Sequence, residues 1–371
     1  MKKRTVKSVI SCLLALAFCL GCLAGCGSNA PEETTPATEE SFDQYKNYPE
    51  IDYYTLDLAQ YVTVGQYKGL VIEATPKPVI SDEVVAEKIA SDLMYSGYTV
   101  KVTDRAVTKE DTVSISYEGF LDGVAFAGGK GSKDNFTVYN GGGFIDGFAD
   151  GLVGAMPGVE FDLHVTFPEQ YHTASLAGKP VIFKVTVHHI YAAAELTDEI
   201  ANAITKGEHT TAASMTEYYK NRLVEENDLE YKYYRANLVW SRIFAELKSI
   251  NIPDDMVNNL YGNQLYWAKY YADMYGTTLD EYLKSNGDTR ESLREETRNN
   301  ILTNMVIYSI MKTENVTLSD SDYYKFIIES GKSEEEWLKS YTKEELTDMF
   351  LYTKTFYAVS DWQTFVEKEA G

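Results

Sequence analysis

The sequence predicts an α+β protein in which a small antiparallel half-barrel with one short helix is joined to a mostly helical domain. Two observations predict this class. Residues 108–191 contain short runs in which apolar and polar residues alternate, a pattern typical of half-buried strands. From residue 195 onward the chain has long stretches without glycine or proline, which favour long helices.

The N-terminus predicts export. Basic residues within the first seven positions precede an apolar run over residues 9–24, which is too short to span a bilayer comfortably. Small residues lead into Cys26, and this arrangement resembles the bacterial lipobox. The resemblance implies cleavage before Cys26 and transfer of a diacylglyceryl group to its thiol, which would anchor the protein to a membrane. The alternative is an ordinary secretory signal with a cysteine there by chance.

Cysteine usage limits the chemistry of the exported body. All four cysteines lie within the first 26 residues, so a processed chain would keep only Cys26. We therefore expect no disulfide, no thiolate nucleophile and no cysteine metal site. His188 and His189 are adjacent on an expected strand and would point to opposite faces, so no metal and no cofactor is expected.

The charge excludes nucleic acid as a partner. Four of the 34 lysines and arginines fall in the first 25 residues, which leaves 30 against 56 acidic residues and a net charge of −26. A body this acidic repels nucleic acid and anionic lipid headgroups.

Composition shifts divide the chain. Residues 27–50 are rich in Ser, Pro, Thr and Glu and are typical of disorder. An alternating run over residues 61–74 is typical of a strand, and Ser81 is the expected N-cap of a helix. The predicted boundaries are 1–25 for a lipoprotein signal peptide, 26–60 for a disordered tether, 61–107 for a linker strand and helix packing with the helical body, 108–192 for the half-barrel, and 193–371 for the helical domain.

Local motifs support the individual elements. Asp122-Gly123 is typical of a two-residue hairpin turn between strands. In the helical domain, Thr278, Ser333 and Thr342 each stand three residues before a glutamate, which predicts capping boxes at three helix starts.

The glycine-rich stretch over residues 139–158 does not predict a phosphate site. No Gly-x-x-x-x-Gly-Lys-Ser/Thr motif is present, and no parallel βαβ context surrounds the stretch. Glycines here are expected to let the backbone turn sharply and present Phe144, Ile145 and Phe148.

An ordered set of motifs over residues 108–191 carries a family resemblance. It comprises a Tyr-x-Gly strand end, an Asp-Gly turn before a Phe, Phe-Ile-x-Gly-Phe, Gly-x-x-x-Gly, Phe-Pro-Glu-x-Tyr-His and Leu-Ala-Gly-Lys. Together they resemble an FKBP-type prolyl isomerase domain, of the variety found in trigger factors. Residues 195–371 resemble the helical chaperone body of the same family. The ribosome-docking domain has no counterpart; a signal peptide and tether stand in its place, so no ribosome partner is expected.

The resemblance implies prolyl isomerisation in a dry aromatic pocket, with no nucleophile, base or metal. Phe148 would form the pocket floor, the Ile145 N–H would hold the substrate carbonyl, and the Tyr117 phenol would lie at the pocket edge. The implied pocket residues are Tyr117, Phe126, Phe136, Phe144, Ile145, Phe148, Tyr171 and Phe183. The sequence departs from the family at two places. At the position of Ala127 the family usually has an acidic residue. The stretch before Asn140 is one residue short, which makes the placing of Phe136 uncertain. The alternative is that these aromatics are ordinary core.

The helical domain has no catalytic signature, and its expected role is to cradle unfolded chains on exposed apolar side chains. The candidates for this cradle are Leu260, Tyr261, Leu265, Trp267, Tyr270 and Tyr271. The sequence thus predicts a folding factor anchored on the extracytoplasmic face of the cell membrane. Its expected partners are unfolded or proline-containing exported polypeptides. The alternative is a non-catalytic holdase that keeps the isomerase fold as a binding module.

Overall fold

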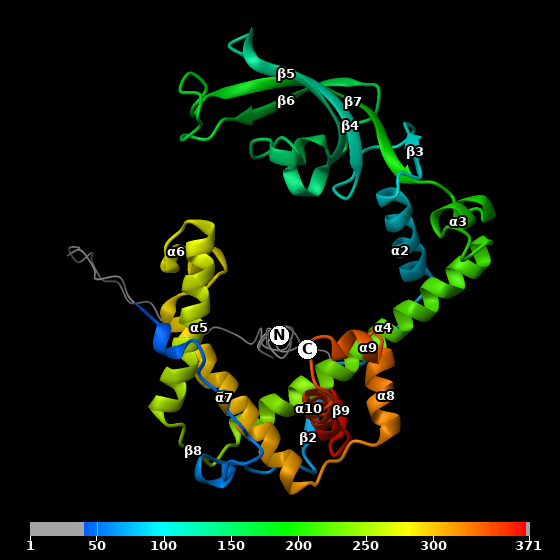
Figure 1. Cartoon of the computed structure of the whole chain (residues 1–371). Helices are drawn as coiled ribbons and strands as arrows, with labels where there is room; N and C mark the ends of the chain where they lie inside the picture. The colour runs from blue at the N-terminus through cyan, green and yellow to red at the C-terminus, as the bar shows by residue number, and fades with distance from the viewer. Residues whose placement is uncertain (1–40, 50, 369–371) are drawn as a thin grey trace, which may run out of the picture. The chain divides into compact units, whose positions relative to one another are not determined.

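The computed structural model describes residues 41–49 and 51–368, which divide into two compact units (Figure 1). Residues 78–228 form one, called the β unit; the segments before and after form the other, called the helical unit. The α+β class is confirmed. The predicted domain boundaries do not coincide with these units, because residues 61–77 belong to the helical unit and residues 78–107 to the β unit.

Among the described residues, the β unit holds a five-stranded sheet whose pairings are all antiparallel. The order along the sheet is β3-β7-β4-β5, and β6 pairs with the other end of β7. The strands are β3 (Thr99–Val102), β4 (Thr112–Leu121), β5 (Val124–Thr137), β6 (Glu160–Thr166) and β7 (Pro180–Ala193).

The hairpin between β4 and β5 has the predicted two-residue turn. Leu121 pairs with Val124, and the intervening Asp122 and Gly123 have φ angles of 50° and 81°. Two successive positive φ angles are what a hairpin turn that follows the strand twist requires. The turn sets the register of the first pairs, and two register shifts farther along the ladder bring Phe136 opposite Val113.

The segment between β5 and β6 makes tight turns instead of the expected short α-helix. It contains the 3-10 helices η3 (Val138–Gly143) and η4 (Asp150–Leu152), which lie on one face of the sheet (Figure 1). Gly147 and Gly154 have φ angles of 85° and 89°, which interrupt any longer helix. The core of the β unit lies between these turns and the sheet, where Phe148 and Leu152 meet Val113 and Val185.

A separate helical cluster belongs to the β unit. Helix α2 (Asp82–Tyr95) begins at the predicted N-cap Ser81, whose side chain accepts a hydrogen bond from the Val84 N–H. Its buried side chains pack against α3 (Asp198–Ile204) and the first part of α4 (Ala212–Ala245). The second part of α4 belongs to the helical unit.

The helical unit consists mainly of helices with well-formed ends. They are α5 (Asp254–Tyr275), α6 (Leu279–Ser285), α7 (Arg290–Thr313), α8 (Asp320–Glu329), α9 (Glu334–Leu338) and α10 (Lys343–Asp361). The capping boxes predicted at Thr278, Ser333 and Thr342 are confirmed. Two further boxes, at Thr289 and Ser319, use Ser292 and Asp322 in place of glutamate.

The strand expected over residues 61–74 is split into two short pieces. Strand β1 (Val62–Thr63) pairs with β8 (Ser249–Ile250), and β2 (Val71–Ala74) pairs in parallel with β9 (Thr364–Glu367). Between the two pieces, Gly65 lies close to the residue that follows α4, because a Cβ there would lie 2.2 Å from the Glu246 carbonyl oxygen.

The predicted disordered tether is wrong in its C-terminal part. The structure contains η1 (Asp43–Tyr45) and η2 (Leu58–Gln60), with Phe42 and Leu58 buried beside them. The prediction relied on the Ser- and Pro-rich composition and overlooked these apolar side chains, which are buried. None of the described helices is long and apolar enough to cross a membrane, and the apolar run at 9–24 lies outside the described residues.

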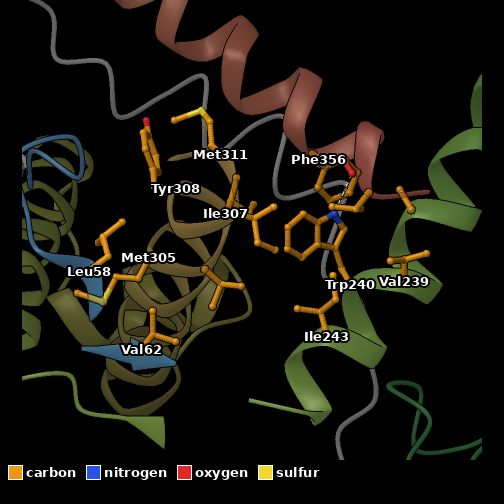
Figure 2. Packing of buried hydrophobic residues seen from close by; sticks show 14 of the residues in the cluster. Leu58, Val62, Val239, Trp240, Ile243, Met305, Ile307, Tyr308, Met311 and Phe356 are labelled. Carbon is orange, nitrogen blue, oxygen red and sulfur yellow. Dashed lines mark hydrogen bonds between the residues drawn. The ribbon is translucent and has the colours of Figure 1, made fainter. Parts of the chain in front are cut away.

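The largest core of the helical unit surrounds Trp240 of α4 (Figure 2). Its ring stacks on Phe356 of α10 at 5.9 Å between centroids, and its Nε1–H donates to the Phe356 carbonyl oxygen at 2.9 Å. Ile243 and Ile307 fill the space around the ring. Trp240 therefore joins helices that are more than a hundred positions apart in the sequence.

We expect Trp240→Ala to lower the free energy of unfolding of the helical unit by about 3–5 kcal/mol, because it leaves a cavity and removes the Nε1–H hydrogen bond to the Phe356 carbonyl oxygen. Denaturant unfolding measures the change. The control Tyr324→Ala removes a ring that is 50% exposed and should cost less than about 1 kcal/mol. Equal losses of unfolding free energy in the two variants would contradict the conclusion that Trp240 lies at the centre of this core.

Candidate functional site

Rings from several elements of the β unit gather in one cluster between the sheet and the turns around η3 and η4. The cluster is where the predicted pocket residues meet. Tyr117 comes from β4, Phe126 and Phe136 from β5, Phe183 from β7, and Phe144, Ile145 and Phe148 from the turn between η3 and η4.

Phe148 is the centre of this aromatic cluster and has no exposed surface. Its ring centroid lies 5.3 Å from that of Phe183 and 5.7 Å from that of Tyr117, both edge-on. Phe144 stacks on it at 4.2 Å with 17° between the ring planes. The expected floor of the pocket is therefore covered by one of its expected walls.

Phe136, whose placing in the implied pocket the sequence left uncertain, lies in the same cluster. Its ring lies 5.3 Å from Phe144 and 6.5 Å from Phe148, and it is 1% exposed. Phe136 pairs with Val113 of β4, beyond two register shifts of the β4–β5 ladder.

The second half of the cluster depends on a residue that sequence analysis missed. Phe126 contacts Phe183 and Phe167, each at 5.8 Å, and Phe167 lies 4.4 Å from Tyr171. Phe167 is 5% exposed and joins Tyr171 to the other rings. The signal was present, since Phe167 opens the Phe-Pro-Glu-x-Tyr-His motif.

Glycines on β4 and β5 leave space for the aromatic rings. A Cβ on Gly119 would lie 2.4 Å from Phe126 and 2.7 Å from Phe183. On β5, a Cβ at Gly129 would meet Phe126 at 2.7 Å, and one at Gly131 would meet the Tyr117 hydroxyl at 2.7 Å. The rings lie directly against strand backbone, so a larger residue at any of these positions would displace a ring.

The polar groups at the cluster are few. Within the described part of the chain the Ile145 N–H donates to no acceptor, and its side chain is half-buried. No described group forms a hydrogen bond with the Tyr117 hydroxyl, and Ala127, where the family usually has an acid, is exposed. The Lys133 Nζ lies 5.5 Å from the Phe144 centroid, so a cation stands over the outer ring.

An ion pair fixes the loop that carries Phe144. Arg105 donates to both carboxylate oxygens of Asp111, at 2.7 and 2.8 Å, and the Thr108 N–H adds a third hydrogen bond at 2.7 Å. Burial opposes ionisation, but these hydrogen bonds hold the Asp111 pKa below its usual range. Asp111 also accepts from the Val138 N–H through its carbonyl, which ties η3 to the start of β4.

The predicted cradle residues on α5 do not share one environment. Tyr270 and Tyr271 are exposed, with exposed fractions of 51% and 41%. Leu265 is 3% exposed, so the expectation of an exposed contact there is wrong: it packs against α6. Leu260, Tyr261 and Trp267 are half-buried. Met274 and Tyr275, which the sequence analysis did not select, extend the exposed surface by one turn.

The expected lipidation site, Cys26, lies outside the described residues. Across residues 41–49 and 51–368, no group of three or more His, Cys, Asp or Glu side chains has an arrangement that would hold a metal ion.

Two family models match the chain. The model of the FKBP-type peptidyl-prolyl cis-trans isomerase matches residues 103–188, which include the whole aromatic cluster. The model of the bacterial trigger factor C-terminus matches residues 211–355, which run from α4 into α10.

Similar proteins span most of the chain. The trigger factor of Bacillus subtilis is 35% identical over 312 residues, covering 79% of this chain and 72% of its own. That of Lachnoclostridium phytofermentans is 33% identical over 325 residues, covering 82% and 74%. A solved structure of the trigger factor chaperone covers 77% of this chain and 70% of its own at 19% identity, with a TM-score of 0.30. The sequence matches, not this structure, show the relationship.

We expect Gly131→Ala to displace the Tyr117 ring and to cost about 1–3 kcal/mol of unfolding free energy, because the new methyl overlaps the phenol. Denaturant unfolding and the NMR shifts of the Tyr117 ring measure both effects. Ser132→Ala, at the exposed neighbouring position, is the matched control and should change neither. Unchanged Tyr117 shifts in Gly131→Ala would show that the ring does not lie on β5.

Proposed function

Because the chain belongs to the trigger factor family, we propose that it is an exported folding factor that combines prolyl isomerisation with the binding of unfolded chains. The observation that carries the isomerase is the convergence of rings around Phe148 beside an unused Ile145 N–H. An apolar ring surface and a single donor are what a prolyl ring and its adjoining carbonyl need.

The chemistry asked of this site is rotation about one amide bond. The barrier is about 18–20 kcal/mol because planarity carries resonance, while cis and trans X–Pro differ by only about 0.5–1 kcal/mol. The planar amide is more charge-separated than the twisted one, so a surface of rings without water favours the twisted form. The Ile145 N–H orients the substrate by donating a hydrogen bond to its carbonyl oxygen, and no group of the chain exchanges a proton or forms a covalent bond.

Access to Phe148 requires a movement of Phe144. The two rings are stacked at 4.2 Å, so a prolyl ring replaces Phe144 on Phe148 when that side chain turns outward. Phe144 is only half-buried and lies at the outer side of the cluster, below Lys133. The exchange places one apolar ring where another was, which keeps Phe148 dry throughout.

A second candidate function is that of a non-catalytic holdase. Three observations favour it: Phe144 fills the space above Phe148, the Tyr117 hydroxyl lacks a described partner, and Ala127 supplies no carboxylate. In this reading the β unit binds client segments on its surface without speeding their isomerisation.

The chaperone activity is assigned to exposed aromatic and methionine side chains of α5. Side chains of this kind make adaptable contacts with many sequences. They succeed one another along the last turns of the helix, as Tyr270, Tyr271, Met274 and Tyr275.

The proposed location is the outer face of the cytoplasmic membrane, with the lipid on Cys26. The basic start, the short apolar run and the small residues before Cys26 support this location. The 15 residues from Gly27 to Ser41 would then separate the membrane from the first buried side chain, Phe42.

We expect the chain from residue 27 onward to accelerate the refolding of a model protein whose folding is limited by proline isomerisation. Tyr117→Ala should lower kcat/KM by about tenfold or more, because it removes a ring that contacts both Phe144 and Phe148. The control Tyr139→Ala removes a ring that is 68% exposed in the same unit and should change the rate less than about twofold. Circular dichroism confirms that both variants fold. A wild-type rate no faster than that of Tyr117→Ala would leave the holdase as the function.

We expect Cys26→Ser to release the protein from the membrane fraction of a bacterial host, because the modified thiol is gone. Fractionation and incorporation of labelled fatty acid measure the two consequences. Cys22→Ser changes a cysteine in the apolar run and should leave both unchanged. Membrane retention of Cys26→Ser without label would place the anchor elsewhere.

A further inference from the structure

The first described residues of the chain are seated on α5 and α6. Phe42 is 8% exposed and packs with Leu265 and Ala268 of α5 and with Leu279 and Leu283 of α6. Figure 1 shows this segment running alongside α5. We call residues 41–48 the strap, and the surface of α5 and α6 that it covers the strap site.

The strap site has a feature shaped for an aromatic ring. Gly262 lies in the interior of α5, where glycine costs about 1 kcal/mol relative to alanine. A Cβ at this position would lie 2.5 Å from Cδ2 and 2.6 Å from Cγ of Tyr45, so the ring rests directly on the helix backbone. Gly262 therefore makes room for a ring at this point of α5.

The strap site also recognises main chain. Asn263 is 2% exposed, and its Nδ2 donates to the carbonyl oxygens of Tyr45 at 2.6 Å and Lys46 at 3.4 Å. One turn earlier, the Asn259 Nδ2 donates to the Tyr48 hydroxyl at 3.0 Å. A ring seat beside a main-chain donor is a combination that suits polypeptide segments in general rather than one particular side chain.

The strap binds the NH2 group of the Asn263 side-chain amide but not its oxygen. The Oδ1 of Asn263 is buried and accepts no hydrogen bond from any described residue. The strap is turned, and the N–H groups of the two residues whose carbonyls Asn263 binds are already used: Tyr45 and Lys46 donate to the carbonyls of Phe42 and Asp43 at 2.9 and 3.2 Å. An extended segment would present a carbonyl and an N–H together and would satisfy both ends of the amide.

We propose that the strap site is a binding site for extended polypeptide segments with spaced aromatic residues, and that the strap is an occupant supplied by the chain itself, which such a segment displaces. The inference rests on the proposed chaperone function. It assigns that function a location on the chain and a means of regulation by the strap. The strap places the side chains of Phe42, Tyr45 and Tyr48 against α5 and α6, and so shows that the site takes aromatic side chains. Bound to its own strap, the site stays covered until a client competes.

Tryptic cleavage after Lys46 tests displacement in the full-length protein without any substitution. The exposed Lys46 side chain lies 5.6 Å from the Tyr266 ring while the strap is seated. Addition of an excess of a reduced, carboxymethylated unfolded protein should speed cleavage at Lys46 by about tenfold, because the free strap fits a protease better. Unchanged cleavage while the unfolded protein is bound would overturn the proposal and leave the chaperone function standing.

A fluorescent peptide that copies residues 41–48 tests the site directly. In a full-length variant with Phe42→Ala and Tyr45→Ala, the peptide should bind about tenfold more tightly than to the wild type, because the competing strap is weakened. Gln44→Ala changes an exposed strap residue and is the matched control, with wild-type affinity expected. Adding Asn263→Leu to the double variant should abolish the gain.

Thermal unfolding separates a weakened strap from a damaged unit. Equal peptide affinity in the wild type and in a double variant that unfolds at the wild-type temperature would overturn the proposal. If the peptide binds at the strap site but the unfolded protein does not bind at all, the result would support the binding site and contradict the proposed chaperone function. If the double variant unfolds early, the cleavage experiment on the wild type decides.

Discussion

The aromatic cluster of the β unit depends on the contact between its rings and strand backbone that carries no side chain. Gly119 on β4, and Gly129 and Gly131 on β5, allow Tyr117 and Phe126 to lie flat on the sheet. This lets the rings of several elements approach Phe148 closely enough to exclude water from it. The same close approach makes the cluster intolerant of change, because no flexible side chain lies beneath the rings to adjust.

Much of this arrangement is predictable from the sequence because local signals carry it. The Asp122-Gly123 turn joins β4 to β5 and sets their first pairs, and an N-cap serine starts α2. The site residues could be named only through an ordered set of motifs, since their mutual contacts span from Tyr117 to Phe183. Phe167 was missed because a buried ring in a motif and a ring in a site have the same sequence pattern.

What the sequence could not reveal depends on contacts between distant segments. Leu265 has the apolar neighbours of an exposed aromatic stripe, but α6 folds back over it. Phe42 and Tyr45 stand at the end of a polar, proline-rich stretch, and only α5 and α6 give them something to pack against. In each case burial is decided by a partner that no local window of sequence contains.

The two candidate binding surfaces solve the same physical problem in the same way. A protein that binds unfolded chains must present apolar rings to water, and large uncovered patches promote association. Here Phe144 covers Phe148, and the strap covers Gly262 and Asn263 with Tyr45. Both covers are side chains of the protein itself, held beside the surface by the chain, so their effective concentration is high and their removal needs a ligand of similar chemistry. In both proposals a client ring takes the place of a ring of the protein itself, which changes the exposed apolar area little. Selectivity then depends on the groups that bind the client main chain, which are the Ile145 N–H and the Asn263 side-chain amide.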